Sequence, residues 1–367
     1  MPGLYVHIPF CVRKCYYCDF YSEEGPRALS LFIEGLKKEI ALSADIEGRP
    51  SMISTIYLGG GTPSLLSPEQ VTEILQPIFE QFAVLPEAEI SMEVNPGTVV
   101  PKQLADYRKA GVNRLSVGIQ SFLDEELTLL GRIHTAEEAI RTLRQTKEAG
   151  FDNIGLDLIY GLPNQTLEDW KISIEEAVRQ HVKHISCYAL TWSEKTVLGS
   201  RIVTGDLPAP DEDVISDMYL SASRTLRENG FEHYEISNFA RPGFRCIHNE
   251  AYWTGEPYLG FGPSAHSFVG DARYWNVSDL EEYLDHIDKG ESPVGGRETL
   301  SDEQRKLEKI ALSLRTKEGL LLDDVTINRV EVDASIQMGL ADLNAGRFRL
   351  TPEGFLLADE IAVRLTS

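Results

Sequence analysis

Short apolar, mostly β-branched segments alternate with helical patterns over the first half of this 367-residue chain. Such segments are typical of strands that are covered on at least one face. Because a helical pattern follows each one, we expect a parallel sheet with right-handed crossovers. The predicted strands are 5–8, 55–58, 89–94, 114–117, 153–158 and 184–190.

The predicted starts of the helices support this alternation of strands and helices. Ser67, Thr135 and Ser301 each precede a helical pattern, with Gln or Glu three residues later, which is the capping-box spacing. Six strand–helix units in succession favour a partial barrel over a flat doubly wound sheet. The sequence therefore predicts an α/β fold built on a partial (β/α)6 barrel.

Three regions differ in composition. We expect the barrel at 1–210 and an aromatic- and Gly-rich extension at 211–295, formed by a helix and then irregular structure. The last region, 296–367, is predicted to be a small, mostly helical C-terminal domain. Its segment 347–354 has the pattern of a short strand and turn before a last helix, as in a winged helix.

The net charge and the hydropathy of the chain limit the classes of function that it can have. Lys and Arg total 35 against 57 Asp and Glu, and the resulting net charge of −22 disfavours binding to nucleic acid. No apolar run approaches the length of a membrane span. The chain passes directly from Met1 into a strand-like segment, so we expect no signal peptide and a cytoplasmic location.

Three of the five cysteines lie within eight positions, Cys11, Cys15 and Cys18, with the spacing C-x3-C-x2-C. Three thiolates on one loop can bind three irons of a [4Fe–4S] cubane, and the fourth iron is then free to bind a small molecule. This arrangement is typical of radical S-adenosylmethionine (SAM) proteins. A disulfide framework is disfavoured by the odd cysteine count. A zinc site would need a fourth ligand, and the nearest candidate, His7, lies in a predicted strand.

Polar and Gly residues follow the predicted strands where a barrel binds its ligands. Each alone could be a satisfied structural polar group. Together they converge on one rim, where carboxylates suit the ribose and ammonium of SAM and Arg suits its carboxylate. These candidates are Gly60, Gly61, Thr62, Glu93, Gln120, Arg132 and Asp157.

The motifs resemble the oxygen-independent coproporphyrinogen III oxidase (HemN) superfamily of radical SAM proteins over essentially the full chain. The resemblance is carried by the cysteine loop, Gly-Gly-Gly-Thr-Pro, Glu-Val-Asn-Pro, Gly-Ile-Gln-Ser and Asp-Leu-Ile-Tyr-Gly-Leu-Pro. It implies a radical SAM barrel with SAM at the open iron and with Tyr5 and Tyr17 beside it.

Two branches of this superfamily compete. The oxidase branch carries a fourth cysteine two residues after the third, whereas Asp19, Phe20 and Tyr21 follow Cys18 here, and only ten residues precede Cys11. The segment 248–253, His-Asn-Glu-Ala-Tyr-Trp, matches the H-N-x-x-Y-W motif of the haem-chaperone branch, HemW. The resemblance thus favours a haem chaperone without oxidase activity, and the alternative is a radical SAM decarboxylase acting on coproporphyrinogen III.

The chaperone resemblance implies that His248 binds haem iron. His233, His266 and Cys246 are reserve ligands, and Cys187, in an apolar strand, is predicted to be a core thiol. The implied partners are haem and haem-acceptor proteins. Docking on membrane-bound respiratory enzymes and formation of a homodimer stay open, as does SAM cleavage, because SAM can serve as a bound regulator.

Overall fold

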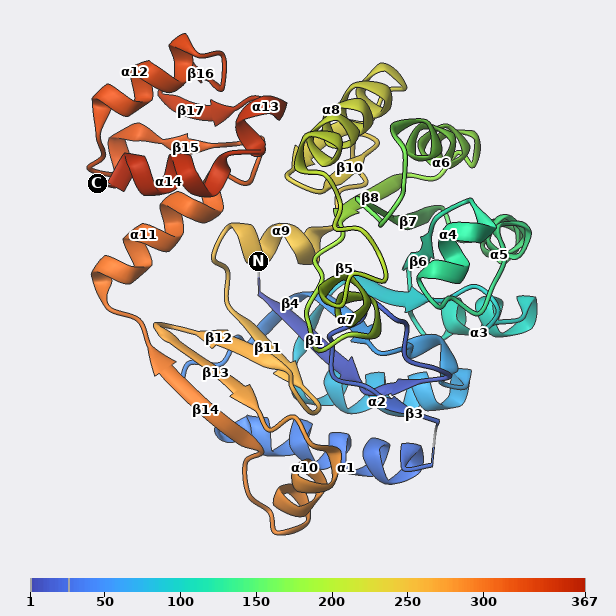
Figure 1. Ribbon diagram of the computed structural model, residues 1–367. Helices are drawn as coiled ribbons and strands as arrows, with labels where there is room; N and C mark the ends of the chain where they lie inside the picture. The colour runs from blue at the N-terminus through green and yellow to red at the C-terminus, as the bar shows by residue number, and fades with distance from the viewer. Residues whose placement is uncertain (1, 26, 367) are drawn as a thin grey trace.

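The computed structural model describes residues 2–25 and 27–366 (Figure 1). The six predicted strands lie side by side in sequence order, and each pairs in parallel with the next. This confirms the predicted α/β fold and its six strand–helix units. The strands are β1 (Gly3–Ile8), β4 (Met52–Gly60), β5 (Ala83–Val94), β6 (Arg114–Gln120), β7 (Asn153–Tyr160) and β8 (His184–Ala189).

Helices connect these strands and cover their outer face (Figure 1). The predicted capping boxes are present: Ser67 opens α2, Thr135 opens α5 and Ser301 opens α11. The connecting helices are α1 (Leu29–Leu42), α2 (Pro68–Gln81), α3 (Pro101–Lys109), α4 (Asp124–Leu129), α5 (Ala136–Glu148) and α6 (Leu167–Arg179). After β8 follow α7 (Val197–Val203) and α8 (Glu212–Glu228).

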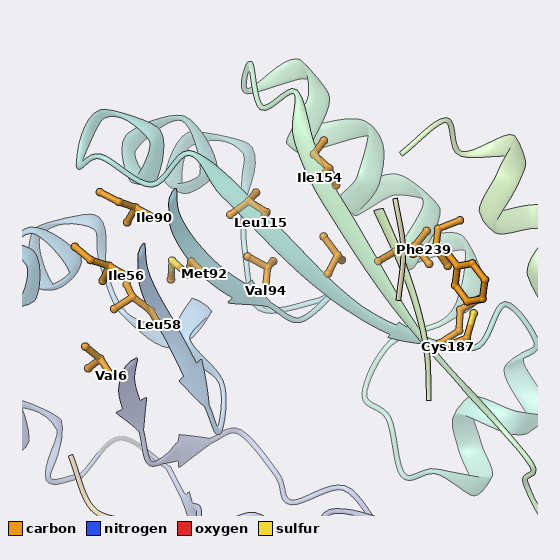
Figure 2. Close-up of a cluster of buried hydrophobic side chains, with 14 of the residues drawn as sticks. Val6, Ile56, Leu58, Ile90, Met92, Val94, Leu115, Ile154, Cys187 and Phe239 are labelled. Atoms are coloured by element: carbon orange, nitrogen blue, oxygen red, sulfur yellow. The ribbon is translucent and has the colours of Figure 1, made fainter. Parts of the chain in front are cut away.

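Side chains alternate along the parallel strands, with a register shift in β4 between Ile53 and Thr55. One set is apolar and packs into the main core, and Figure 2 shows its members Val6, Leu58, Met92 and Leu115 on four neighbouring strands. The other set points into the barrel and is polar, aromatic or small, except for Ile159. The barrel interior is therefore not filled by branched apolar side chains.

Strands from the 211–295 region extend the sheet at both ends. Beside β8 lie β10 (Asn238–Ala240) and β9 (Glu232–Glu235), and beside β1 lie β11 (Tyr258–Phe261), β12 (His266–Val269), β13 (Ala272–Asn276) and β14 (Val294–Thr299). The expectation of irregular structure after the helix was wrong, because these strands are only three to six residues long, too short for a clear periodicity. The same region also carries α9 (Ile247–Trp253) and α10 (Leu280–Asp288).

The C-terminal part is helical, as predicted, and adds a small sheet (Figure 1). It contains α11 (Asp302–Ser313), α12 (Arg329–Gln337), α13 (Pro352–Phe355) and α14 (Ala358–Thr366). The antiparallel sheet has the order β15 (Leu320–Leu321), β17 (Arg347–Leu350) and β16 (Ala341–Asn344). Because β14 crosses the proposed boundary at 295/296, the division into three domains stays a prediction. Among the described residues, no helix is both long and apolar enough to cross a bilayer.

The apolar side chains on the outer face of the parallel strands should contribute strongly to the free energy of unfolding. Leu115 is fully buried in the core, and Leu115→Ala should lower the free energy of unfolding by about 2–5 kcal/mol, because a cavity replaces packed methyl groups. Leu307 is 44% exposed on α11, and Leu307→Ala should change it by less than about 0.5 kcal/mol. Chemical denaturation of both variants measures the difference, and equal losses would contradict the core assignment.

Candidate cluster and cofactor site

A cavity of about 490 Å³ occupies the barrel interior and the carboxyl ends of its strands. Its wall brings together residues that are far apart in the sequence, from Tyr5 to Asn249. Every predicted cluster and SAM residue lies in this wall: Cys11, Cys15, Cys18, Tyr5, Tyr17, Gly60, Gly61, Thr62, Glu93, Gln120, Arg132 and Asp157.

The cysteine loop follows β1 directly. Cys11 ends the short strand β2 (Phe10–Cys11), which pairs with β3 (Glu23–Glu24), and the N–H of Cys18 donates to the carbonyl of Cys15 at 3.2 Å. The hydroxyl of Thr62 and the guanidinium of Arg132 donate to the sulfurs of Cys11 and Cys15, each at 3.5 Å. Donors of this kind stabilise thiolates.

The three thiols do not converge on one point. In the described part of the chain, no three His, Cys, Asp or Glu side chains form a group that could hold a single metal ion. A zinc ion requires such convergence, whereas a cubane cluster offers a separate iron to each thiolate. The donor set therefore fits a cluster better than a mononuclear site.

The Gly-rich turn after β4 lies against the start of the cysteine loop. Gly60 has a φ of 108°, which L side chains rarely adopt. A Cβ on Gly61 would come within 2.6 Å of the carbonyl oxygen of Phe10 and 2.9 Å of that of Ile8. Only glycine allows this close approach, so the turn can bring backbone groups up to the cavity beside Cys11.

Two carboxyl groups enter the cavity from β5 and β7. Glu93 accepts a hydrogen bond from the hydroxyl of Tyr57 at 3.1 Å, and Asp157 accepts from Ser116 at 3.1 and 3.2 Å. Burial and the nearby charge of Asp157 raise the pKa of Glu93 to about 8, and burial also raises the pKa of Asp157. A cationic ligand between these groups would favour their ionised forms.

Arg132 is held by the strand ends. Its Nη2 donates to Asn95 Oδ1 at 2.7 Å and to the carbonyl of Gly118 at 2.6 Å, while its Nε is buried and has no hydrogen-bond partner. An orphaned guanidinium N–H in a cavity wall fits a ligand carboxylate. Gln120 follows with a φ of 73°, a strained conformation that is common at binding sites.

Two residues of this wall were not predicted as site residues. Asn95 bridges the site, since its Nδ2 donates to Thr62 and its Oδ1 accepts from Arg132. Its position at a strand end, before Pro96, is a signal that could have identified it. Tyr57 had no such signal, because an aromatic residue inside an apolar strand is usually part of the core.

The structure places His248 outside the cavity wall, at the back of the barrel. It is 2% exposed, its Nδ1 lies 2.9 Å from Thr55 Oγ1, and its Nε2 lies 2.9 Å from the hydroxyl of Tyr252. The imidazole also stacks on Tyr57 at 5.1 Å, and burial lowers its pKa to about 3. Both ring nitrogens are therefore engaged, and the role of His248 as a haem ligand stays a prediction.

The alternative haem ligands named above lie in different parts of the structure. His233 is stacked on Phe239 at 4.1 Å, and His266 is exposed beside Trp275. Cys246 lines the barrel cavity, where burial and Glu89 raise its thiol pKa to about 12. Cys187 is 1% exposed in the core, as predicted.

Known proteins share both the motifs and the fold. Residues 5–177 match the Radical SAM superfamily. The chain is 36% identical to the haem chaperone HemW of Mycobacterium tuberculosis H37Rv, over 98% of this chain and 93% of that protein. It is 39% identical to Escherichia coli HemW, over 73% and 70%. The chain belongs to the HemW family of radical SAM proteins.

Two further proteins are similar to this chain along nearly its whole length. Mouse radical S-adenosyl methionine domain-containing protein 1, a mitochondrial protein, is 35% identical over 99% of this chain and 87% of its own length. Among solved structures, coproporphyrinogen III oxidase (HemN) from Escherichia coli superposes with a TM-score of 0.84 at 26% identity, covering 99% of this chain and 89% of the oxidase. The partial barrel and the C-terminal part are thus common to HemW and HemN.

Loss of one cavity thiol should release the cluster. Cys15→Ala removes one of three ligands, so the anaerobically reconstituted protein should lose most of its iron and sulfide. Cys187→Ala, a matched control in the core, should retain both. Iron and sulfide analysis with absorbance spectra measures this, and a full, stable cluster in Cys15→Ala would refute the ligand assignment.

Binding of SAM should depend on the protonation of Glu93. A net cationic ligand favours the ionised carboxylate, so binding should release a proton and weaken as the pH falls below about 8, by about fivefold from pH 8 to pH 7. Glu93→Gln should bind weakly with little pH dependence. Titration calorimetry at several pH values tests this, with the exposed Glu137→Gln as control. A parental pH profile in Glu93→Gln would contradict the assignment.

Proposed function

We propose that this protein is a cytoplasmic haem chaperone that binds haem and transfers it to an acceptor protein. The observation that carries the proposal is the similarity to HemW haem chaperones over nearly the whole chain. The H-N-x-x-Y-W segment supports it, because it forms a distinct short helix, α9, between the barrel and the C-terminal part.

In this proposal the barrel cavity holds a [4Fe–4S] cluster on Cys11, Cys15 and Cys18, with SAM beside it. Arg132 Nε offers a donor for the SAM carboxylate, and Glu93 and Asp157 offer acceptors for its ammonium and ribose. When bound, the cluster supplies an open iron and one-electron chemistry. The protein encloses these ligands, and because burial raises the pKa of both Glu93 and Asp157, a cation bound between them would favour their ionised forms.

Haem coordination by His248 requires a local rearrangement. The Nε2 atom would have to exchange its hydrogen bond with Tyr252 for the iron, and Nδ1 would retain Thr55. The bond to Thr55 would then orient the ring, as hydrogen bonds to the second nitrogen do in other histidine ligands.

Oxidase activity on coproporphyrinogen III is the second candidate. It is favoured by the superposition on HemN along 99% of the chain. The residues after Cys18 count against it, because Phe20 stands where the oxidase motif has its fourth cysteine.

Two assays on the anaerobically reconstituted protein separate these functions. Hemin titration followed by absorbance should show saturable binding, and an added apo-acceptor, apomyoglobin, should take up the haem. His248→Ala should weaken hemin binding by at least tenfold with its iron and sulfide unchanged. Coproporphyrinogen III should not be converted. Conversion to protoporphyrinogen IX at the rate of an oxidase, or no hemin binding by the parent, would overturn the chaperone proposal.

A further inference from the structure

A chain of hydrogen bonds joins two of the three cysteines of the N-terminal loop. Thr62, in the turn after β4, donates to Cys11 Sγ at 3.5 Å, and Arg132 Nη1 donates to Cys15 Sγ at 3.5 Å. The side chain of Asn95, directly after β5, lies between these two donors. Its Nδ2 donates to Thr62 Oγ1 at 3.1 Å, and its Oδ1 accepts from Arg132 Nη2 at 2.7 Å. Both donors to the cysteine sulfurs are therefore bonded to one amide group.

The chemistry of these groups fixes the direction of each bond. A guanidinium group can only donate, so the amide atom that faces Arg132 is the oxygen, and the amide nitrogen faces Thr62. Because an amide N–H points at the Thr62 oxygen, the single hydroxyl proton of Thr62 points elsewhere, and its acceptor is Cys11 Sγ. The orientation of the Asn95 amide thus determines the orientation of the Thr62 hydroxyl.

The surrounding residues hold the Asn95 amide in place. Its backbone N–H donates to Ser64 Oγ at 3.1 Å, and its carbonyl accepts from Thr98 Oγ1 at 2.7 Å. A Cβ on Gly118 would come within 2.8 Å of Asn95 Oδ1, so the glycine leaves the space that the amide fills. These contacts restrict the amide to one position, as expected of a residue that orients others.

We infer that Asn95 is a positioning residue that sets the reduction potential of the cluster through Thr62 and Arg132. Hydrogen bonds to the sulfurs of an iron–sulfur cluster are among the factors that set its potential. A donor offsets negative charge on the sulfur, so it favours the reduced form, which carries one more electron, and raises the potential. The inference rests on the proposed binding of a cluster by the three loop cysteines and concerns how the protein tunes it.

The change Asn95→Asp keeps the size of the side chain and tests the direction of the bonds. A carboxylate oxygen replaces the amide nitrogen, so the Thr62 hydroxyl would donate to it and no longer to Cys11. One-electron reduction of the cluster should become roughly tenfold less favourable, which corresponds to about 59 mV. Redox titration with mediator dyes measures this in the anaerobically reconstituted full-length protein without SAM. Asn344→Asp adds the same charge at an exposed position of β16 and should leave the potential unchanged.

A double-mutant cycle separates the hydrogen bond from the added charge. Thr62→Val removes the hydroxyl and should lower the potential by itself, whereas Thr62→Ser keeps the hydroxyl and should retain the parental potential. In the Thr62→Val background, Asn95→Asp should shift the potential by less than half of its shift in the parent, because no hydroxyl is left to turn. Asn95→Leu removes the amide without adding a charge and should also lower the potential, so it replaces Asn95→Asp if that variant assembles no cluster.

An equal shift on Asn95→Asp in the parent and in Thr62→Val would reveal a pure charge effect and overturn the inference. A parental potential in Asn95→Leu or in Thr62→Val would overturn it as well. In each of these cases the haem-chaperone proposal would stand, because hemin titration of the parent tests it separately. A parent that assembles no cluster on the three loop cysteines, as measured by its iron and sulfide, would instead defeat the proposed cluster site and the inference with it.

Discussion

The two-faced character of the parallel strands is the constraint on which the rest of this structure depends. In most (β/α) barrels, branched apolar side chains fill the interior. Here the outward positions of β1 and β4–β8 supply the apolar core against the helices, and the inward positions carry small, polar or tyrosine side chains. The hydrophobic stabilisation therefore comes from one face of the sheet, and the other face is left to enclose a cavity.

The polar interior of the barrel encloses carboxyl groups, and their surroundings decide how readily they ionise. Carboxyl groups such as Glu93 and Asp157 tolerate enclosure because hydroxyl groups of Tyr57 and Ser116 donate to them and because they can hold a proton. Burial raises the pKa of both carboxyl groups, so enclosure disfavours their ionised forms. A cationic ligand supplies the missing charge, so the same groups that cost stability as ions provide affinity for it.

Helix α9 contacts β4 through His248 and Thr55, and its last turn lines a separate cavity of about 840 Å³ beside α11. Its first turn is held by Glu89 of β5, whose oxygens accept from the N–H groups of Ile247 and His248 at 3.2 Å and lie 3.5 Å from the thiol of Cys246. Negative charge is favourable at a helix N-terminus, so this contact fixes α9 against the sheet. The H-N-x-x-Y-W segment is thereby divided between two cavities: Asn249 faces one, Tyr252 and Trp253 face the other, and His248 lies between them.

Local features of the sequence were enough to predict the six parallel strands and the capping boxes at Ser67, Thr135 and Ser301, because periodicity and spacing act over a few residues. The family followed from the resemblance of its motifs to those of known proteins. The barrel cavity was also anticipated in part, because parallel strands bring polar residues such as Glu93, Arg132 and Asp157 to one end of the sheet.

Only the tertiary structure decided what surrounds each side chain. It engaged both nitrogens of His248 and made Asn95 a bridge between Thr62 and Arg132. The contact between Thr55 and His248 joins residues that are 193 positions apart, and no local pattern encodes it.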